Sequence, residues 1–426
     1  MSEKIKIEDP YYPIVYVRGY AMTGENKNDA VHDTYYGFNA SSVELRNAPP
    51  PRYFAIDAFE GQLIKFIKSQ EYTDETNSGL EKEGWDKSRG IWICRFYDED
   101  YIRDITRNIE DHARDLYNLI NVQIPERLKS VGVDLGENDD EYKVILIAHS
   151  MGGLVCRTLI QNIMPEKNED PKKRIHRLVT MGTPHNGIDM GAIPDFVESF
   201  INKNINPYNA NIFDRDVMRK YLKIDQKDAD GKYIYDANSL GDPKGKYSYP
   251  VKRCLCIIGS DHDSYNLVKT ITGKYSDGLV KQNNAYVVSG PRSQASAGDG
   301  RNPEYPESQK AFYANVHRAH SGFRGIVNSY ESYENIKRFL FGNITADVCL
   351  TEIKISKPET DDKYFYDFEF NASIKGTNTY LHRREQDPCE NAIRISYSEI
   401  PKEIQLYTGF LNSKLRMDKE DEFSHF

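Results

Sequence analysis

The chain has 426 residues, a formal net charge of −9 at pH 7, and 39% hydrophobic residues. This length predicts one large domain with insertions, or a large and a small domain, with enough apolar material for a core. The acidic balance and the lack of a clustered basic patch exclude a nucleic-acid-binding surface. No apolar run has the length of a signal peptide near the start, or of a bilayer span further on.

Six cysteines at irregular spacing do not resemble a disulfide framework. A reducing cytoplasm is therefore the expected compartment, although export without a cleavable signal would leave the same sequence pattern.

Short buried strands alternate with amphipathic helices along most of the chain. Strands are expected at residues 12–18, 91–96, 143–148, 177–181 and 253–258, and helices at 55–70, 101–131 and 151–164. Such alternation indicates parallel βαβ units. The fold class expected is therefore α/β, with a doubly wound, mostly parallel sheet and helices on both faces.

The alternation stops in two places. Between about 187 and 250 the chain carries an apolar helical stripe, made of Ile193, Phe196, Val197, Phe200 and Ile201. This stripe fits either a helix packed on the core or a mobile lid over an apolar site. From residue 344 onward, period-2 patterns indicate a small β-rich appendage. We thus expect a main domain at 1–343, with a helical lid or cap insertion at 187–250, and a C-terminal region at 344–426; the segment 25–52 has no assignment.

The stretch "LIAHSMGGLVCR" places a serine between the most apolar strand and a helix. Ala148, Ser150 and Gly152 form a small-x-Ser-x-Gly pattern, typical of a nucleophile elbow. The residues two positions before and after this serine must be small, because the strand and the helix pass closely there. The turn exposes the hydroxyl at a helix N-terminus, where free amides favour developing negative charge.

A serine nucleophile needs a base and an acid that orients it. Downstream, "YSDGLVKQ" offers Asp277, and "ANVHRAHSGFRG" offers His317 and His320. Each of these candidates falls in a loop beyond a strand, where parallel α/β folds place functional groups.

These motifs together resemble the α/β-hydrolase family, and within it the lipase and esterase branch. "AHSMGG" is similar to that branch's elbow, "VTMGTPHNG" to the strand and loop after the elbow helix, "SDGLV" to the acid segment, and "HSG" before a last helix to the histidine segment. The ordered set covers residues 12–342.

The resemblance implies that Ser150 is the nucleophile, His320 the general base and Asp277 its orienting acid. The oxyanion hole would consist of the backbone amides of Tyr20 and Met151. It implies no cofactor and no metal. Arg18 stands where the family usually has a histidine before glycine, a departure that alters substrate contacts more than mechanism.

Alternatives to two of these assignments remain open. His317 competes with His320, although His320 fits the loop and the spacing to the last helix better. Asp261 and Asp263 follow their strand more closely than Asp277, but only "SDGLV" matches the family's acid segment.

Other polar residues near the motifs have simpler interpretations. We expect His149 and His185 to be structural. Cys254 and Cys256 share one face of a strand and are expected to be buried thiols, because further metal ligands are not evident.

The predicted function is hydrolysis of carboxylic esters through an acyl-enzyme, on a small-molecule or lipid ester. The apolar stripe near Phe196 and Phe200 favours an acyl-chain substrate, as in a lipase or phospholipase, and a lid there would give transient contact with a lipid surface. The competing hypotheses are a thioesterase or amidase with the same triad, and a catalytically silent binding protein on a hydrolase fold.

Overall fold

The computed structural model describes most of the chain. Described are residues 5–19, 28, 30–33, 35–38, 61–76, 86–103, 105, 107–188, 211–264, 274–292, 305–322, 324–356 and 364–416, with the backbone alone at 43–46 and 55–58. The apolar stripe at 193–201 and Tyr20 lie outside these residues, as does much of the unassigned segment 25–52.

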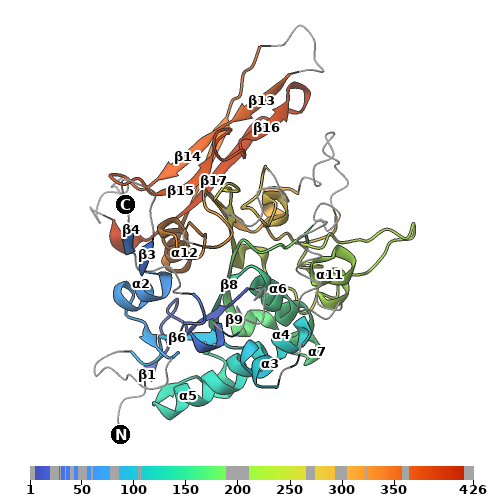
Figure 1. Cartoon of the computed structure of the whole chain (residues 1–426). Coiled ribbons are helices and arrows are strands. Elements are labelled where there is room, and N and C mark those ends of the chain that lie inside the picture. Colours follow the sequence, from blue (N-terminus) through green and yellow to red (C-terminus); the bar gives the residue numbers. More distant parts are fainter. Residues whose placement is uncertain are drawn as a thin grey trace.

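A parallel sheet forms the centre of the main domain (Figure 1). Its seven described strands are β2 (Ile14–Val17), β5 (Thr73–Asp74), β6 (Gly90–Cys94), β8 (Val144–His149), β9 (Ile175–Met181), β10 (Cys254–Gly259) and β11 (Phe312–Val316). Their order across the sheet is β11-β10-β9-β8-β2-β6-β5, and every neighbouring pair runs parallel. The predicted α/β fold class is therefore confirmed.

Helices cover both faces of this sheet. Described helices are α2 (Gln62–Ser69), α3 (Tyr97–Arg103), α4 (Ile109–Asn118), α5 (Ile124–Ser130), α6 (Met151–Thr158), α7 (Met164–Glu166), α8 (Pro171–Arg174), α11 (Arg215–Tyr221) and α12 (Tyr330–Phe341). Leu119–Gln123 joins α4 to α5 and Leu159–Ile163 joins α6 to α7, both as π-helical turns. Short 3₁₀ turns lie at Glu137–Asp139, Asn211–Phe213, Val251–Arg253, Gln282–Asn284, Glu307–Gln309, Tyr397–Glu399 and Ser413–Leu415.

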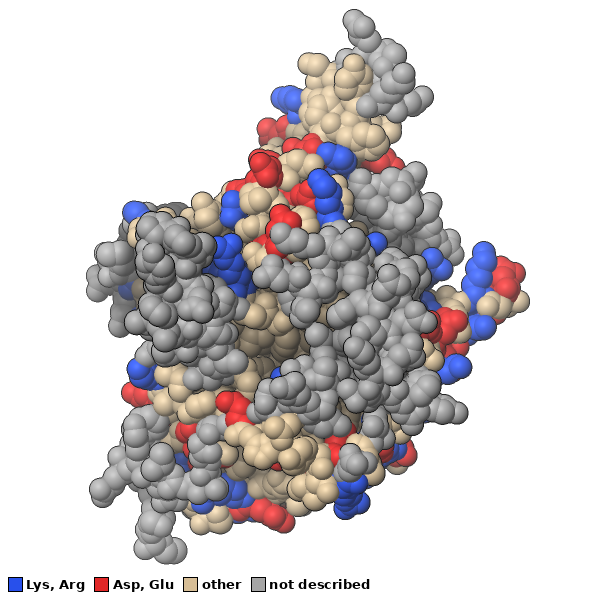
Figure 2. All heavy atoms as spheres, viewed as in Figure 1, with Lys and Arg blue, Asp and Glu red and all other residues tan. Residues whose placement is uncertain are grey.

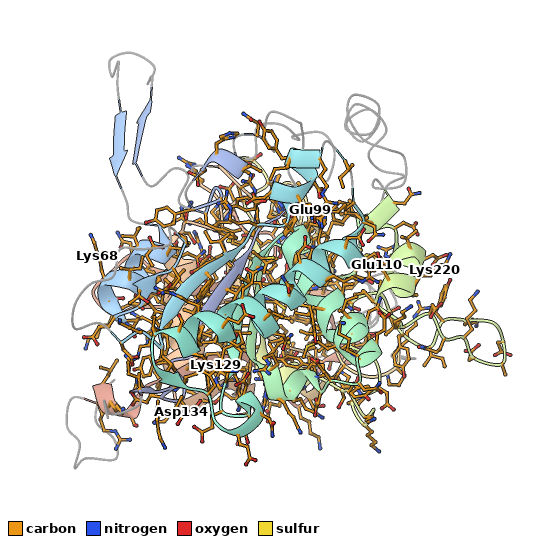
Figure 3. All side chains as sticks on the ribbon, turned by 90° about the horizontal axis from the view of Figure 1, so that it is seen from below. Lys68, Glu99, Glu110, Lys129, Asp134 and Lys220 are labelled. Atoms are coloured by element: carbon orange, nitrogen blue, oxygen red, sulfur yellow. The ribbon has the colours of Figure 1, made fainter. Side chains whose placement is uncertain are left out.

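Packing between the layers explains why the strands are so apolar. The side chains of β8 from Val144 to Ala148 are fully buried, as expected for a strand covered on both faces. Figure 3 shows side chains filling the space between sheet and helices, whereas Lys68 on α2 and Lys129 on α5 point outward. In the described part of the chain, no helix combines the length and apolarity needed to cross a membrane.

Two predicted helices differ from the structure. The helix expected at 55–70 begins only at Gln62, after Gly61; residues Ala55–Ala58 form strand β4, antiparallel to β3 (Val43–Arg46). The helix expected at 101–131 is interrupted, because Asn108 starts α4 with a capping box to Asp111. Ile102 lies before this break and is 79% exposed, so its place in the apolar pattern was misleading.

The C-terminal region, here residues 344–416, consists of antiparallel strand pairs. The pairs are β12 (Ile344–Thr351) with β17 (Glu403–Leu411), β13 (Phe365–Phe368) with β16 (Ile393–Ser396), and β14 (Phe370–Ser373) with β15 (Tyr380–Arg384). This bears out the expected β-rich appendage, which extends away from the main domain in Figure 1. A further short pair joins β1 (Ile5–Lys6) to β7 (Val133–Asp134).

The C-terminal region is anchored on β11 and α12 by aromatic and polar contacts. The ring of Phe410 lies 4.9 Å from that of Phe312 and 5.2 Å from that of Phe339. The buried imidazole of His382 accepts a hydrogen bond at its Nδ1 from the amide of Asn315, at 3.3 Å.

On the face seen in Figure 2, basic and acidic side chains are interspersed rather than gathered into one field.

Candidate active site

Ser150 occupies the sharp turn between β8 and α6. Its backbone has φ 52° and ψ −127°, a conformation that costs about 1–3 kcal/mol for a residue with a side chain. Three hydrogen bonds hold it there: its amide donates to the carbonyl of Met181 at 2.9 Å, and its carbonyl accepts from Thr183 Oγ1 at 2.8 Å and from the amide of Gly153 at 3.1 Å. The surrounding backbone therefore holds the strained turn that the elbow pattern predicted.

Glycines let the elbow helix approach the neighbouring strand. A Cβ on Gly152 would collide with the carbonyl oxygens of Val17 and Arg18, at the carboxyl end of β2. A Cβ on Gly19 would lie 2.7 Å from the Cβ of Ser150. The two glycines thus permit the contact between the elbow and the loop after β2.

His320 lies beside the serine, in the loop that follows β11. Its Nε2 is 3.0 Å from Ser150 Oγ, and its Nδ1 is 2.9 Å from Asp277 Oδ2. A carboxylate only accepts hydrogen bonds, so Nδ1–H donates to Asp277 and Nε2 accepts from the serine hydroxyl. The ring is 3% exposed, which shields both bonds from competing water.

Asp277 is fixed by its own turn. Its Oδ1 accepts hydrogen bonds from the amides of Leu279, at 3.0 Å, and Val280, at 2.7 Å. Its carbonyl accepts from the amide of His320 at 2.8 Å. The aspartate therefore orients both the ring and the backbone of the histidine.

The alternative candidates lie apart from the serine. His317 contacts Ser260 through Nδ1, 3.2 Å from its Oγ, and burial lowers its pKa. Asp261 accepts from the amide of Ser264 at 3.0 Å, and the side chain of Asp263 is 79% exposed. The structure brings together Ser150, His320 and Asp277, and none of these alternatives.

One of the two predicted oxyanion donors can be placed. Met151 is the first residue of α6, so its amide belongs to the helix N-terminus, where the helix itself supplies no acceptor. Tyr20 lies outside the described residues. Arg18, which replaces the usual histidine, donates from Nη1 to the carbonyl of Tyr36 at 2.9 Å.

His149 has a closer relation to the site than the sequence suggested. Its Nε2 lies 2.9 Å from the carbonyl oxygen of His320, and the two rings are 5.0 Å apart. Burial, together with the nearby His320, lowers the pKa of His149 to about 3, so the ring is neutral at pH 7 and donates through Nε2–H. Nothing in the local pattern signals this contact, which spans 171 residues.

His185 is fully buried and bonds Thr180 Oγ1 through Nε2 at 2.9 Å, in line with a structural role.

The cysteines and acidic groups are candidate metal ligands in the part of the chain that the structure describes. All six cysteines are free thiols, and Cys254 and Cys256 are buried. Within the described ranges, no group of three or more His, Cys, Asp or Glu side chains is placed to hold a metal ion.

Comparisons with known proteins found one family model and several solved structures to which this chain is similar. The model of the palmitoyl protein thioesterase family matches residues 93–240. Among solved structures, phospholipase PlaB from Legionella pneumophila is 15% identical to this chain, with a TM-score of 0.41. The match covers 77% of this chain and 60% of the phospholipase chain. Lipase BlEst2 from Bacillus licheniformis, in its mature form, is 14% identical to this chain, with a TM-score of 0.32. That match covers 78% of this chain and 93% of the lipase chain. A search of curated proteins gave no match.

The sheet order and the strained serine between β8 and α6 are those of the α/β-hydrolase fold, and the palmitoyl protein thioesterase model matches residues 93–240 of this chain. The resemblance read from the sequence motifs is therefore confirmed for the fold.

Proposed function

We propose that this protein hydrolyses carboxylic esters with Ser150 as nucleophile, His320 as general base and Asp277 as the acid that orients it. The observation that carries the proposal is the pair of hydrogen bonds at His320, 3.0 Å to Ser150 and 2.9 Å to Asp277. Both lie within the range required for proton transfer and for fixing the tautomer.

The reaction follows from this geometry. Ser150 Oγ attacks the acyl carbon while its proton passes to His320 Nε2, and the carbonyl oxygen takes up negative charge. The amide of Met151, with that of Tyr20 as the predicted second donor, stabilises this oxyanion. His320 then protonates the alcohol oxygen, which leaves, and an acyl-enzyme remains. Water, deprotonated by the same nitrogen, attacks the acyl carbon and releases the carboxylic acid and free Ser150.

We propose an acyl-chain substrate, as in a lipase or phospholipase. The apolar stripe that includes Phe196 and Phe200 supports this from sequence alone. The helical lid and its transient contact with a lipid surface are part of the same proposal. A cytoplasmic location also remains a prediction; the six free thiols are compatible with it.

A thioester is the second candidate substrate. The family whose model matches residues 93–240 carries thioesterase in its description, which favours this alternative over an amide. The same triad can attack either acyl group, because the step at the acyl carbon is the same and only the leaving atom differs.

Ser150→Ala tests the proposal. The wild type should react with a fluorophosphonate probe and hydrolyse p-nitrophenyl esters of increasing chain length. The variant should lose labelling and about 10⁴-fold or more of the rate while keeping its unfolding midpoint. Ser260→Ala is the matched control, because this buried hydroxyl contacts His317 instead of the triad histidine.

The outcomes separate the candidates. Equal labelling of the wild type and Ser150→Ala would refute the assigned nucleophile. A folded wild type that neither reacts with the probe nor turns over any ester or acyl thioester, with or without detergent, would indicate the silent binding protein. Rates on matched oxygen esters and thioesters of the same acyl chain decide between the two substrate classes.

A further inference from the structure

A cavity of about 280 Å³ lies at the seam between the main domain and the C-terminal region. Its lining comes from the loop after β10, with Asp261, the loop after β11, with His317 and Arg318, and the β14–β15 hairpin, with Tyr380 and Arg383. None of the three triad residues lines it. The cavity is therefore distinct from the catalytic site, although it shares the loop that carries the base.

Three guanidinium groups converge on this cavity. Arg318 pairs bidentately with Glu331, with N–O distances of 2.8 and 2.9 Å from Nη2, and Arg383 pairs with Glu385 at 2.8 Å. The third group, Arg324, makes no ion pair with a carboxylate among the residues described. The pairs use the Nε and Nη2 groups, so guanidinium donors remain available on all three arginines.

Carboxylates neutralise two of the three arginines directly. The lining contains the carboxylates of Asp261 and Glu331, and Glu385 pairs with Arg383 from beside the cavity. Glu331 is already bound to Arg318, and Asp261 accepts from the amide of Ser264 at 3.0 Å. Arg324 is thus the arginine of the lining without a carboxylate partner among the described residues, and its nearest described partner is the hydroxyl of Ser264 at 3.5 Å.

Guanidinium groups bind the oxygens of a phosphate with paired, charge-assisted hydrogen bonds. The cavity is larger than a single oxyanion, and Asn378 and Tyr380 line the remaining space with an amide and an aromatic ring. We propose that this cavity binds a phosphate monoester, with the phosphate held by Arg324 and by the free donors of Arg318 and Arg383.

A ligand in this position would connect the hairpin to the base loop. The carbonyl of Arg324 accepts from the amide of Ala319 at 3.0 Å, next to His320 in the chain. On the opposite wall, the hairpin is fixed through Leu381, whose carbonyl accepts from Asn335 Nδ2 at 2.7 Å. Occupancy therefore ties the C-terminal region to the turn that presents the base, and it stabilises the folded protein by mass action.

The test measures binding rather than turnover, so its result is independent of the proposed ester hydrolysis. The full chain is titrated calorimetrically with inorganic phosphate and with glycerol 3-phosphate at constant ionic strength. Sedimentation with phosphatidylcholine vesicles, with and without an ether-linked phosphatidic acid that cannot be hydrolysed, tests a lipid headgroup as the source of the phosphate. Arg324→Gln and Arg383→Gln are compared with Arg114→Gln, an exposed arginine on α4.

Saturable binding should weaken about tenfold or more in Arg324→Gln and Arg383→Gln, and stay unchanged in Arg114→Gln. Binding of glycerol 3-phosphate alone assigns a soluble phosphate ester, and binding only to vesicles with phosphatidic acid assigns a headgroup. Arg324 is exposed, so its substitution should leave the unfolding midpoint intact. No saturable binding of any probe, or equal weakening in the Arg114 control, would overturn the proposal.

Discussion

The nucleophile and its two partners are held by different kinds of structure. Ser150 stands between a central strand and its following helix, and its backbone contacts are made with the neighbouring strand β9 and the loop after it. Asp277 and His320 stand on loops, 43 residues apart, and bond each other through side chain and backbone. Those loops also touch the C-terminal region: Gln282 Nε2 lies 3.3 Å from the carbonyl of Cys389.

This difference predicts different consequences of substitution. Changes at the packing glycines of the elbow should act mainly on stability, because the elbow is part of the sheet core. Changes at the acid and the base should act mainly on rate, because their loops carry less of the packing.

The largest expected effect is on rate. Asp277→Asn should lower kcat by about 10⁴-fold, because an amide in place of the carboxylate no longer fixes the tautomer that accepts the serine proton. The unfolding midpoint should change little. Asp261→Asn is the matched control and should stay within about threefold of the wild type, since Asp261 lies apart from the triad histidine. A greater loss of rate in the control would transfer the acid role to Asp261.

The next effect is on stability. Gly152→Ala should lower the free energy of unfolding by about 3 kcal/mol, because the added Cβ meets the carbonyl oxygens of Val17 and Arg18. Urea titration measures this. Gly245→Ala serves as control, because its Cβ has only Asp242 O at 3.2 Å as a close neighbour. Equal stability of the two variants would mean that the elbow helix has room to move, contrary to the comparison.

The elbow was easier to predict from the sequence than the loops that carry Asp277 and His320. The pattern around Ser150 is local, and steric demands at positions 148 and 152 can be read from a few letters. Asp277 was chosen over Asp261 and Asp263 because "SDGLV" resembles the family's acid segment, and aspartate before glycine also favours a turn in which the carboxylate accepts following amides. The contact of His149 with the base, and that of Gln282 with Cys389, join residues 171 and 107 positions apart, and no local pattern encodes them.

The predicted helix boundaries were wrong where they rested on periodicity alone. Ile102 fits an apolar helical repeat, yet the helix that packs on the sheet starts at Asn108. The capping box of Asn108 and Asp111 is itself a sequence signal, and giving it more weight would have placed this start correctly.

A smaller effect is expected at the hydrogen bond that joins His149, in the elbow, to the carbonyl of His320. His149→Ala removes the donor to the carbonyl of His320 and should lower kcat about tenfold, with KM nearly constant. His149→Gln offers an amide donor at a similar reach and should recover most of the rate. If neither variant changes kcat, the hydrogen bond from His149 does not position the base.

Protonation of buried histidines gives a pH test of the elbow and of the C-terminal region. His149 in the elbow and His382 in the C-terminal region both have their pKa lowered to about 3, mainly by burial. The unfolded chain then binds more protons than the folded one between pH 6.5 and 3, so stability is lost as the pH falls through that window. His149→Gln and His382→Gln should each flatten this fall, by up to about 1.4 kcal/mol per pH unit. Unfolding midpoints measured from pH 7 to 4 check the slopes; slopes identical to the wild type would contradict the neutral burial of these rings.

The smallest effect is expected far from both halves, at the β13–β16 pair. Arg394 bonds Asp367 there at 2.7 Å through two nitrogens, but both side chains are about one-third exposed. Solvent screens such a pair, so Arg394→Ala should change the free energy of unfolding by less than about 0.5 kcal/mol and leave kcat unaltered. The contrast with His382→Gln is informative, because His382 bonds β11 directly, whereas the hydrogen bonds described for Arg394 stay within its own strand pair. A drop in kcat for Arg394→Ala would show that the outer strands, and not only the anchored hairpin, are coupled to the loop that carries His320.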